Sequence, residues 1–120
     1  MSPARKAILK RPDEFRRCYQ EGKVYKNRVA VLHVYDRGDA EPTRVGFSVS
    51  RKLGKAVERN RVKRWLRAIV FPLLPELPHG YDLVFAARTR AKVEGYWPLD
   101  RGIRELLEKA GLLAKEAESN

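Results

Sequence analysis

The chain has 120 residues, which suits one compact domain and leaves little room for a second. Apolar residues make up 43% of it, enough for one modest core, so wholesale disorder is excluded. Lys and Arg number 26 against 15 Asp and Glu, a net charge of +11 that favours a polyanionic partner, with nucleic acid first. Charge alone does not exclude a merely solubilising basic surface.

Other function classes lack their usual signals. Cys18 is the single cysteine, so no intramolecular disulfide is possible, and His33 and His79 stand too far apart for a zinc motif. The sequence contains no secretory signal and no apolar run near the roughly 18 residues of a membrane span. We expect a soluble cytoplasmic protein with neither a membrane partner nor a small-molecule substrate.

The first predicted helix opens at Pro12 and ends at Gly22, which we expect in a left-handed conformation. It brings three side chains to one face, at i, i+3 and i+4: Phe15, Cys18 and Tyr19. Core packing is the simpler interpretation of this face, with Cys18 as a small buried hydrophobe. Stacking of Phe15 and Tyr19 on single-stranded RNA requires their rings to stay open.

Two strands are predicted next, over Val29–Tyr35 and Arg44–Ser50. The turn-forming segment Asp36–Pro42 between them suggests a hairpin. In the second strand, large apolar residues alternate strictly with small ones, and the inward side chains are Val45, Phe47 and Val49.

The longest predicted helix covers Lys55–Leu74, with Pro72 bending or ending it late. Its apolar residues form one continuous stripe: Val62, Trp65, Leu66, Ile69, Val70 and Leu73. A loop, a buried strand over Asp82–Ala87 and a helix over Asp100–Leu113 complete the order αββαβα. This order predicts an α+β sandwich in which helices cover one face of a small, mostly antiparallel sheet.

The segment Arg51–Arg67 concentrates the charge. It holds eight cations and one acid, Glu58, and therefore +7 of the chain's +11. On a helical wheel, Asn60, Arg64 and Arg67 lie opposite the apolar stripe. A solvated charged face would need balancing acids at i±4, which are nearly absent, so we expect phosphates to lie against this face. The predicted RNA-binding residues are Arg51, Lys52, Lys55, Arg59, Asn60, Arg61, Lys63, Arg64 and Arg67.

The turn before this helix contains Gly54. Together with the small residues Gly46, Ser48 and Ser50 and the first backbone N–H groups of the helix, it could seat a phosphate. A plain tight turn explains Gly54 equally well. The two tryptophans, Trp65 and Trp97, are expected in core or edge packing.

The run from Val45 to Arg64, which contains Arg59-Asn60-Arg61 after a glycine-serine strand, resembles the signature of the bacterial ribonuclease P protein family. The likeness extends to the early aromatic helix, to Asn27-Arg28 and to Gly80-Tyr81-Asp82. It implies a single RNA-binding domain over residues 1–120, flexible at about 1–8 and 114–120. It also implies an αβββαβα sandwich with a left-handed βαβ crossover, although such crossovers are normally right-handed.

The resemblance further implies a function as the protein component of an endoribonuclease, whose RNA subunit carries the catalysis and binds most of the Mg²⁺. The basic helix would bind that catalytic RNA. A cleft between the first helix and the sheet would take the 5′ leader of precursor tRNA, using Phe15, Tyr19, His33 and Ser48. For His33, a structural role is as compatible with the sequence as an RNA contact.

Two other interpretations stay open. A ribosomal or RNA-chaperone protein would share the basicity, and an autonomous nuclease would share the substrate class. The sequence offers no paired carboxylates, histidine dyad or metal-ligand cluster, so we expect no active site in the protein itself.

Overall fold

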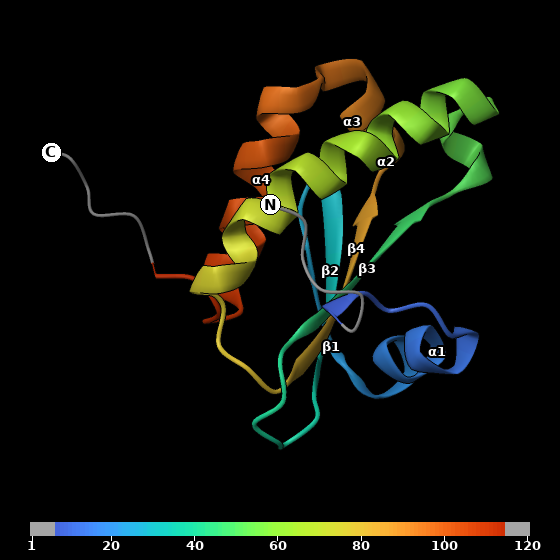
Figure 1. Ribbon diagram of the computed structural model, residues 1–120. Coiled ribbons are helices and arrows are strands. Elements are labelled where there is room, and N and C mark those ends of the chain that lie inside the picture. Colours follow the sequence, from blue (N-terminus) through green and yellow to red (C-terminus); the bar gives the residue numbers. More distant parts are fainter. Residues whose placement is uncertain (1–6, 115–120) are drawn as a thin grey trace, which may run out of the picture.

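A computed structural model describes residues 7–114, which fold around one four-stranded mixed sheet (Figure 1). The strands are β1 (Lys23–Lys26), β2 (Ala30–Asp36), β3 (Arg44–Val49) and β4 (Tyr81–Ala87). Their order across the sheet is β1-β2-β4-β3. The β1/β2 and β2/β4 pairs are antiparallel, while β3 and β4 are parallel.

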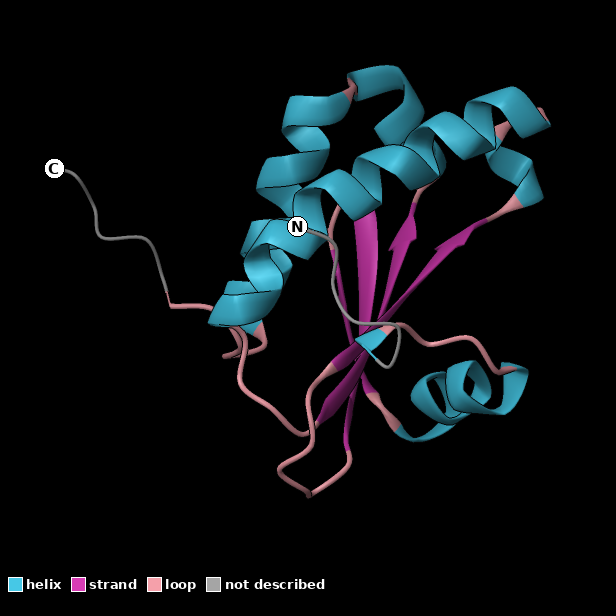
Figure 2. Ribbon diagram, in the orientation of Figure 1, coloured by secondary structure: helices cyan, strands magenta, loops and turns pink. Residues whose placement is uncertain are grey.

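The helices form layers on both sides of the sheet. They are α1 (Pro12–Glu21), α2 (Ala56–Val70), α3 (Thr89–Glu94) and α4 (Tyr96–Lys109), and short 3-10 helices cover Arg51–Leu53 and Phe71–Glu76. Figures 1 and 2 show α2, α3 and α4 together on one side of the strands and α1 on the other. The predicted α+β class is therefore confirmed, with α2 as the crossover between the parallel strands β3 and β4.

The main core lies between the sheet and the layer of α2, α3 and α4. As predicted, Val45, Phe47 and Val49 of β3 point into it, beside Leu83 and Phe85 of β4. The apolar stripe of α2 packs on them, with these members buried: Val62, Leu66, Ile69 and Val70. The apolar face predicted from alternation in the strands and the apolar stripe predicted from the helical period thus pack against each other in one layer.

A smaller cluster lies on the opposite face, under α1. It consists of buried Leu9, Cys18 and Val84, with Phe15 and Tyr35 packed against them. Burial raises the pKa of the Cys18 thiol to about 11, and the thiol donates to the carbonyl oxygen of Asp82 at 3.6 Å. Cys18 is therefore a protonated packing residue, as the sequence predicted.

The carboxylate of Asp82 is fully buried on β4 and binds three arginines. Arg44 Nη2 lies 2.8 Å and Arg17 Nη2 3.0 Å from Oδ2, and Arg37 Nη1 lies 2.6 Å from Oδ1. Burial would raise the pKa of the carboxyl, but the hydrogen bonds from Arg44, Arg37 and Arg17 outweigh it and lower the pKa. The three arginines come from β3, α1 and the β2–β3 connection, so this ion cluster joins three parts of the chain to the beginning of the interior strand β4, next to Tyr81.

Several strand predictions are corrected. The Asp36–Pro42 segment does not close a hairpin, because β4 lies between β2 and β3 and pairs with both. The residue pattern also missed β1, a four-residue edge strand in which lysines occupy both ends. Helices cover both faces of the sheet rather than one, since α1 lies opposite the other three.

Helix boundaries differ as well. The long helix ends at Val70 and continues as the 3-10 helix that contains Pro72, and the last helix starts at Tyr96 after an additional short helix, α3. Gly22 is extended (φ −85°), not left-handed; a Cβ there would come within 2.5 Å of the Cys18 carbonyl oxygen and 2.7 Å of that of Val34.

The flexible ends, at about residues 1–8 and 114–120, stay a prediction. Ile8 forms a bridge with Val45, and the Leu9 amide donates to the Val45 carbonyl at 2.8 Å. The rest of the predicted N-terminal and C-terminal flexible segments, at residues 1–6 and 115–120, lies outside the described residues.

Replacing Asp82 by Asn should lower the free energy of unfolding at pH 7 by about 3–5 kcal/mol, because three guanidinium groups lose their buried counter-charge. The lowered pKa means that this stabilisation is present above about pH 4 and is lost as the pH falls below it. Urea denaturation should therefore show the two proteins converging at acid pH.

The matched control is Asp13→Asn, whose carboxylate pairs with Arg11 at the surface. It should cost less than about 1 kcal/mol. A gap between wild type and Asp82→Asn that stayed the same at pH 3 and pH 7 would contradict the role of the charge.

Candidate nucleic-acid interface

The start of α2 is set by Gly54 and Glu58. The Lys55 amide donates to Glu58 Oε1 at 3.0 Å, which caps the helix. Gly54 has φ +154°, and a Cβ there would collide with the Glu58 carboxylate. Since Glu58 already accepts from the first free amide, the structure favours the tight-turn interpretation of Gly54 over a phosphate seat.

Helix α2 separates apolar from charged residues as predicted. Asn60, Arg64 and Arg67 are exposed on the side away from the core, and Trp65 is half-buried at its margin. Most of the remaining cations of the segment are exposed too, and only Arg59 and Lys63 are half-buried. All nine predicted RNA-binding residues lie on α2 or on the short segment before it, and together they are called here the α2 cationic surface.

The cations of this surface have no acidic partners among residues 7–114. None of its eight Lys and Arg side chains forms an ion pair there, and Glu58 pairs with Lys92 of α3 instead. Elsewhere, several arginines are neutralised: three bind Asp82, and Arg28 and Arg90 share Glu94. No acid of the described chain pairs with a cation of the α2 cationic surface, whose charge stays uncompensated.

Two arginines of this surface have further distinctive contacts. The Nε atom of Arg59 is buried and has no hydrogen-bond partner in the described part of the chain. The guanidinium carbon of Arg61 lies 5.5 Å from the ring centroid of Trp65, a cation–π arrangement. The first is an unsatisfied buried donor, and the second holds a cation beside an aromatic ring.

On the other face of the sheet, three predicted leader-binding residues meet. The rings of Phe15 and Tyr19 lie 6.5 Å apart, and Tyr19 contacts the His33 ring edge-on at 4.7 Å. Phe15 packs over Gly46, where a Cβ would come within 2.6 Å of its ring. Phe15 is therefore partly a core residue, whereas Tyr19 is 43% exposed.

Sheet register places Ser48 one step away from these rings. His33 lies opposite Val84, and Val84 opposite Gly46. The next position on this face of β3 is Ser48, opposite Ala86, which in turn pairs with Val31. Val31, Ala86 and Ser48 are all half-buried, so this part of the sheet face is not fully covered. We call these three residues and the Phe15–Tyr19–His33 rings the α1 cleft, after the cleft that the sequence resemblance predicts.

The His33 side chain is uncharged in this setting. Burial lowers the pKa of His33 below its ordinary value, and its Nδ1 has no partner among the described residues. Because this Nδ1 is itself buried, any contact of His33 with a base or sugar would use the rest of the ring.

The α1 cleft and the α2 cationic surface meet at the end of β3, because Ser48 precedes Arg51 by three residues. Sequence reasoning missed a pocket of about 420 Å³ at the same end of the sheet, lined by Lys26, Asn27, Arg28, Arg88, Thr89 and Arg90. Only the pairing of β1, β2 and β4 brings these cations together, so no local sequence signal marks them.

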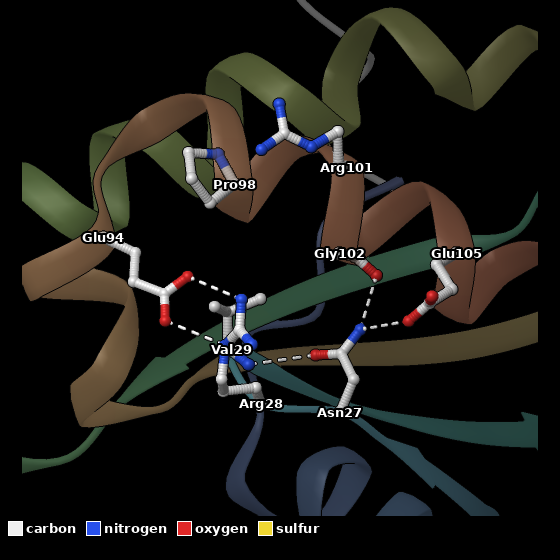
Figure 3. Close-up of a pocket in the computed structure, with 8 residues that line it drawn as sticks. All are labelled: Asn27, Arg28, Val29, Glu94, Pro98, Arg101, Gly102 and Glu105. Atoms are coloured by element: carbon white, nitrogen blue, oxygen red, sulfur yellow. Dashed lines mark hydrogen bonds and ion pairs between the residues drawn. The ribbon is translucent and has the colours of Figure 1, made fainter.

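A second pocket, of about 350 Å³, is lined by Asn27, Arg28 and residues of α4 (Figure 3). Its polar side chains, apart from that of Arg101, are already paired with one another or with backbone groups. Asn27 Nδ2 donates to Gly102 O at 3.0 Å and to Glu105 Oε1 at 2.9 Å, and Arg28 Nε lies 2.8 Å from Glu94. These contacts fasten the β1–β2 turn to α3 and α4.

Among residues 7–114, no three or more His, Cys, Asp or Glu side chains lie together in a way that could hold a metal ion. Within the same residues, no helix has the length and apolar character needed to cross a membrane.

Fold and site together define a small α+β protein with an unneutralised cationic helix on one side of its sheet and an aromatic cleft on the other. The sequence model described as Ribonuclease P matches residues 4–111. The chain thus belongs to the ribonuclease P protein family, as the resemblance indicated.

Curated relatives and solved structures support membership of the same family. The chain is 46% identical over 102 residues to the ribonuclease P protein component of Symbiobacterium thermophilum, covering 85% of this chain and 89% of that protein. For the Geobacillus kaustophilus protein of the same name the identity is 37%, with 92% of each chain covered. The RNase P protein of Staphylococcus aureus superposes with a TM-score of 0.82 at 28% identity, over 89% of this chain and 97% of that one. The RNase P protein of Thermotoga maritima superposes with a TM-score of 0.74 at 30% identity, over 85% of this chain and 96% of that one.

Because Arg64 has no ion pair in the described chain, Arg64→Ala should change the free energy of unfolding by no more than about 0.5 kcal/mol. Arg44→Ala removes the same charge but leaves the buried Asp82 short of a partner, so it should cost about 3–5 kcal/mol. Urea denaturation of the two variants in moderate salt checks this contrast. Equal losses would show that Arg64 has a structural partner.

Proposed function

We propose that this chain is the protein subunit of ribonuclease P. In this proposal the α2 cationic surface binds the catalytic RNA, and the α1 cleft binds the 5′ leader of precursor tRNA. The complex removes the leader in a metal-dependent reaction and so generates the mature 5′ end of the tRNA in the cytoplasm. The observation that carries the proposal is the set of eight cations on and before α2 without acidic partners in residues 7–114.

Electrostatics support RNA as the partner of α2. Cations that repel one another along a helix destabilise it unless an opposite charge approaches. Phosphates supply that charge, and binding releases the counterions condensed on the RNA. The exposed Arg64 and Arg67 are suited to phosphate contacts, because their guanidinium groups have no acidic partner in residues 7–114.

The α1 cleft suits a single strand rather than a duplex. Tyr19 exposes an aromatic surface, and His33 offers a neutral ring beside it. Single-stranded nucleic acid is bound by such rings through base stacking, in a manner that tolerates different sequences. The small residues Ser48 and Ala86 let a strand approach the sheet closely.

We assign the hydrolysis, and the Mg²⁺ that it needs, to the RNA subunit. Mg²⁺ prefers oxygen ligands that include carboxylates or phosphates. The α1 cleft offers a phenol, an imidazole and a hydroxyl, so its side chains do not fit a Mg²⁺ site of their own. The protein instead neutralises phosphates and positions the leader, which lowers the Mg²⁺ concentration that the RNA requires.

Reconstitution with the cognate catalytic RNA tests the α2 assignment. Arg64→Ala should weaken binding to that RNA and reduce the slope of log affinity against log salt by about one. It should also raise the Mg²⁺ concentration needed for cleavage of precursor tRNA. Lys109→Ala, which removes one exposed charge at the far end of α4, should do neither.

Two outcomes would favour other functions. RNA affinity without any effect on leader removal would indicate a general RNA chaperone, and cleavage by the protein without RNA would indicate an autonomous nuclease. Holoenzyme activity that matched that of the RNA alone at low Mg²⁺ would contradict the proposal.

The leader assignment is tested with Tyr19→Ala in the reconstituted complex. Loss of one stacked base should weaken binding of precursor tRNA by about 1–3 kcal/mol and leave mature tRNA unaffected. Tyr19→Phe retains the ring and should bind as wild type does. Because Tyr19 is 43% exposed and lies outside the buried core, the fold should survive the change. Equal losses for precursor and mature tRNA would argue against the cleft.

A further inference from the structure

Three aromatic rings form a connected ladder where α2 and α4 meet. The ring centroids of Trp65 and Tyr96 lie 6.2 Å apart, and those of Tyr96 and Trp97 lie 4.9 Å apart, both in edge-to-face arrangements. Arg61 extends the ladder on the α2 side, above the face of Trp65. The ladder therefore begins within the α2 cationic surface and ends on α4.

The outer end of this ladder is open. Trp97 is 67% exposed, whereas Trp65 and Tyr96 are half-buried, so the expectation of packing holds for Trp65 and is wrong for Trp97. A single exposed apolar residue needs no explanation. Here the exposed indole is instead held in place by a second ring, which leaves a rigid aromatic surface facing solvent.

The charge around the ladder is positive and unneutralised. Arg61 and Arg64 on α2, and Arg101 one turn after Trp97 on α4, form no ion pairs within residues 7–114. Figure 3 shows the Arg101 side chain extending away from the Asn27–Glu105 contacts of the nearby pocket. The neighbouring acids are engaged elsewhere, with Asp100 on Arg104 and Glu94 on Arg28 and Arg90.

We propose that Trp97, supported by Tyr96 and Trp65, is a stacking platform for an unpaired base of the RNA that binds α2. The platform adds a base contact to a surface that otherwise holds phosphates. Rings provide the stacking face, and Arg61, Arg64 and Arg101 hold the adjoining backbone. This inference rests on the proposed function, because it takes the catalytic RNA as the partner of α2.

An RNA fits this surface better than a second copy of the chain. Each chain carries a net charge of +11, so pairing two copies at a face rich in free arginines would bring like charges together. An unpaired nucleotide satisfies both properties of the surface at once, since its base stacks and its phosphate is anionic.

The test measures affinity for the cognate catalytic RNA, transcribed in vitro, at several salt concentrations. Trp97→Ala should weaken binding by roughly tenfold without changing the salt slope, because it removes stacking and no charge. Trp97→Phe should stay within about threefold of wild type, since a smaller ring still stacks. Val93→Ala is the matched control, because Val93 is 78% exposed on neighbouring α3 and lies outside the ladder.

Arg64→Ala, measured beside these variants, separates this inference from the proposed function. If Trp97→Ala binds like wild type while Arg64→Ala binds weakly, the platform is wrong and the RNA-binding role of α2 stands. If neither change matters, the proposed role of α2 fails as well. A change in sedimentation of the free protein caused by Trp97→Ala, with RNA affinity unchanged, would show a protein contact and overturn the platform.

Discussion

The ion cluster around the buried carboxylate of Asp82 on β4 is the interaction on which the arrangement of α1, β3 and the β2–β3 connection depends. A charge removed from water in this way costs several kcal/mol unless hydrogen-bonded counter-charges surround it. Here Arg44, Arg37 and Arg17 do so, and each belongs to a different part of the chain. Because Arg17 is on α1, the same cluster holds that helix against the sheet. The position of Tyr19 over the sheet, and hence the α1 cleft, depends on it.

The distribution of acids explains how one basic chain can be both stable and ready to bind a polyanion. On α1, β4, α3 and α4, carboxylates meet arginines and contribute to the fold. On α2, the lone acid Glu58 caps the helix and pairs with Lys92, so it does not neutralise the outer face. The stability of the helix comes from its buried stripe, and its outer face keeps its charge for a partner.

The local residue pattern predicted the helices and strands better than it predicted which strands pair with each other. The strict alternation at Val45, Phe47 and Val49 and the stripe of α2 both identified core faces correctly, because strand and helix periods are local properties. The hairpin at Asp36–Pro42 was a wrong inference from the same kind of information. In the sheet, β4 lies between β2 and β3 and pairs with both. This arrangement depends on contacts with residues about forty positions later, which the sequence of a turn does not reveal. β1 was missed because a short, lysine-flanked edge strand carries little apolar signal.

By itself, the sequence determined the cationic helix, since the separation of charge from apolar residues follows from spacing along one element. Only the tertiary structure decided which of the aromatic residues face solvent. Phe15, Cys18 and Tyr19 share one helical face, yet the approach of Phe15 to Gly46 and the depth of Cys18 leave Tyr19 alone exposed. Trp97 is exposed for a related reason. Tyr96 occupies the position against Trp65, and Trp97, the next residue of α4, therefore points outward. Exposure depends on what packs above a side chain, and that is a property of the whole fold.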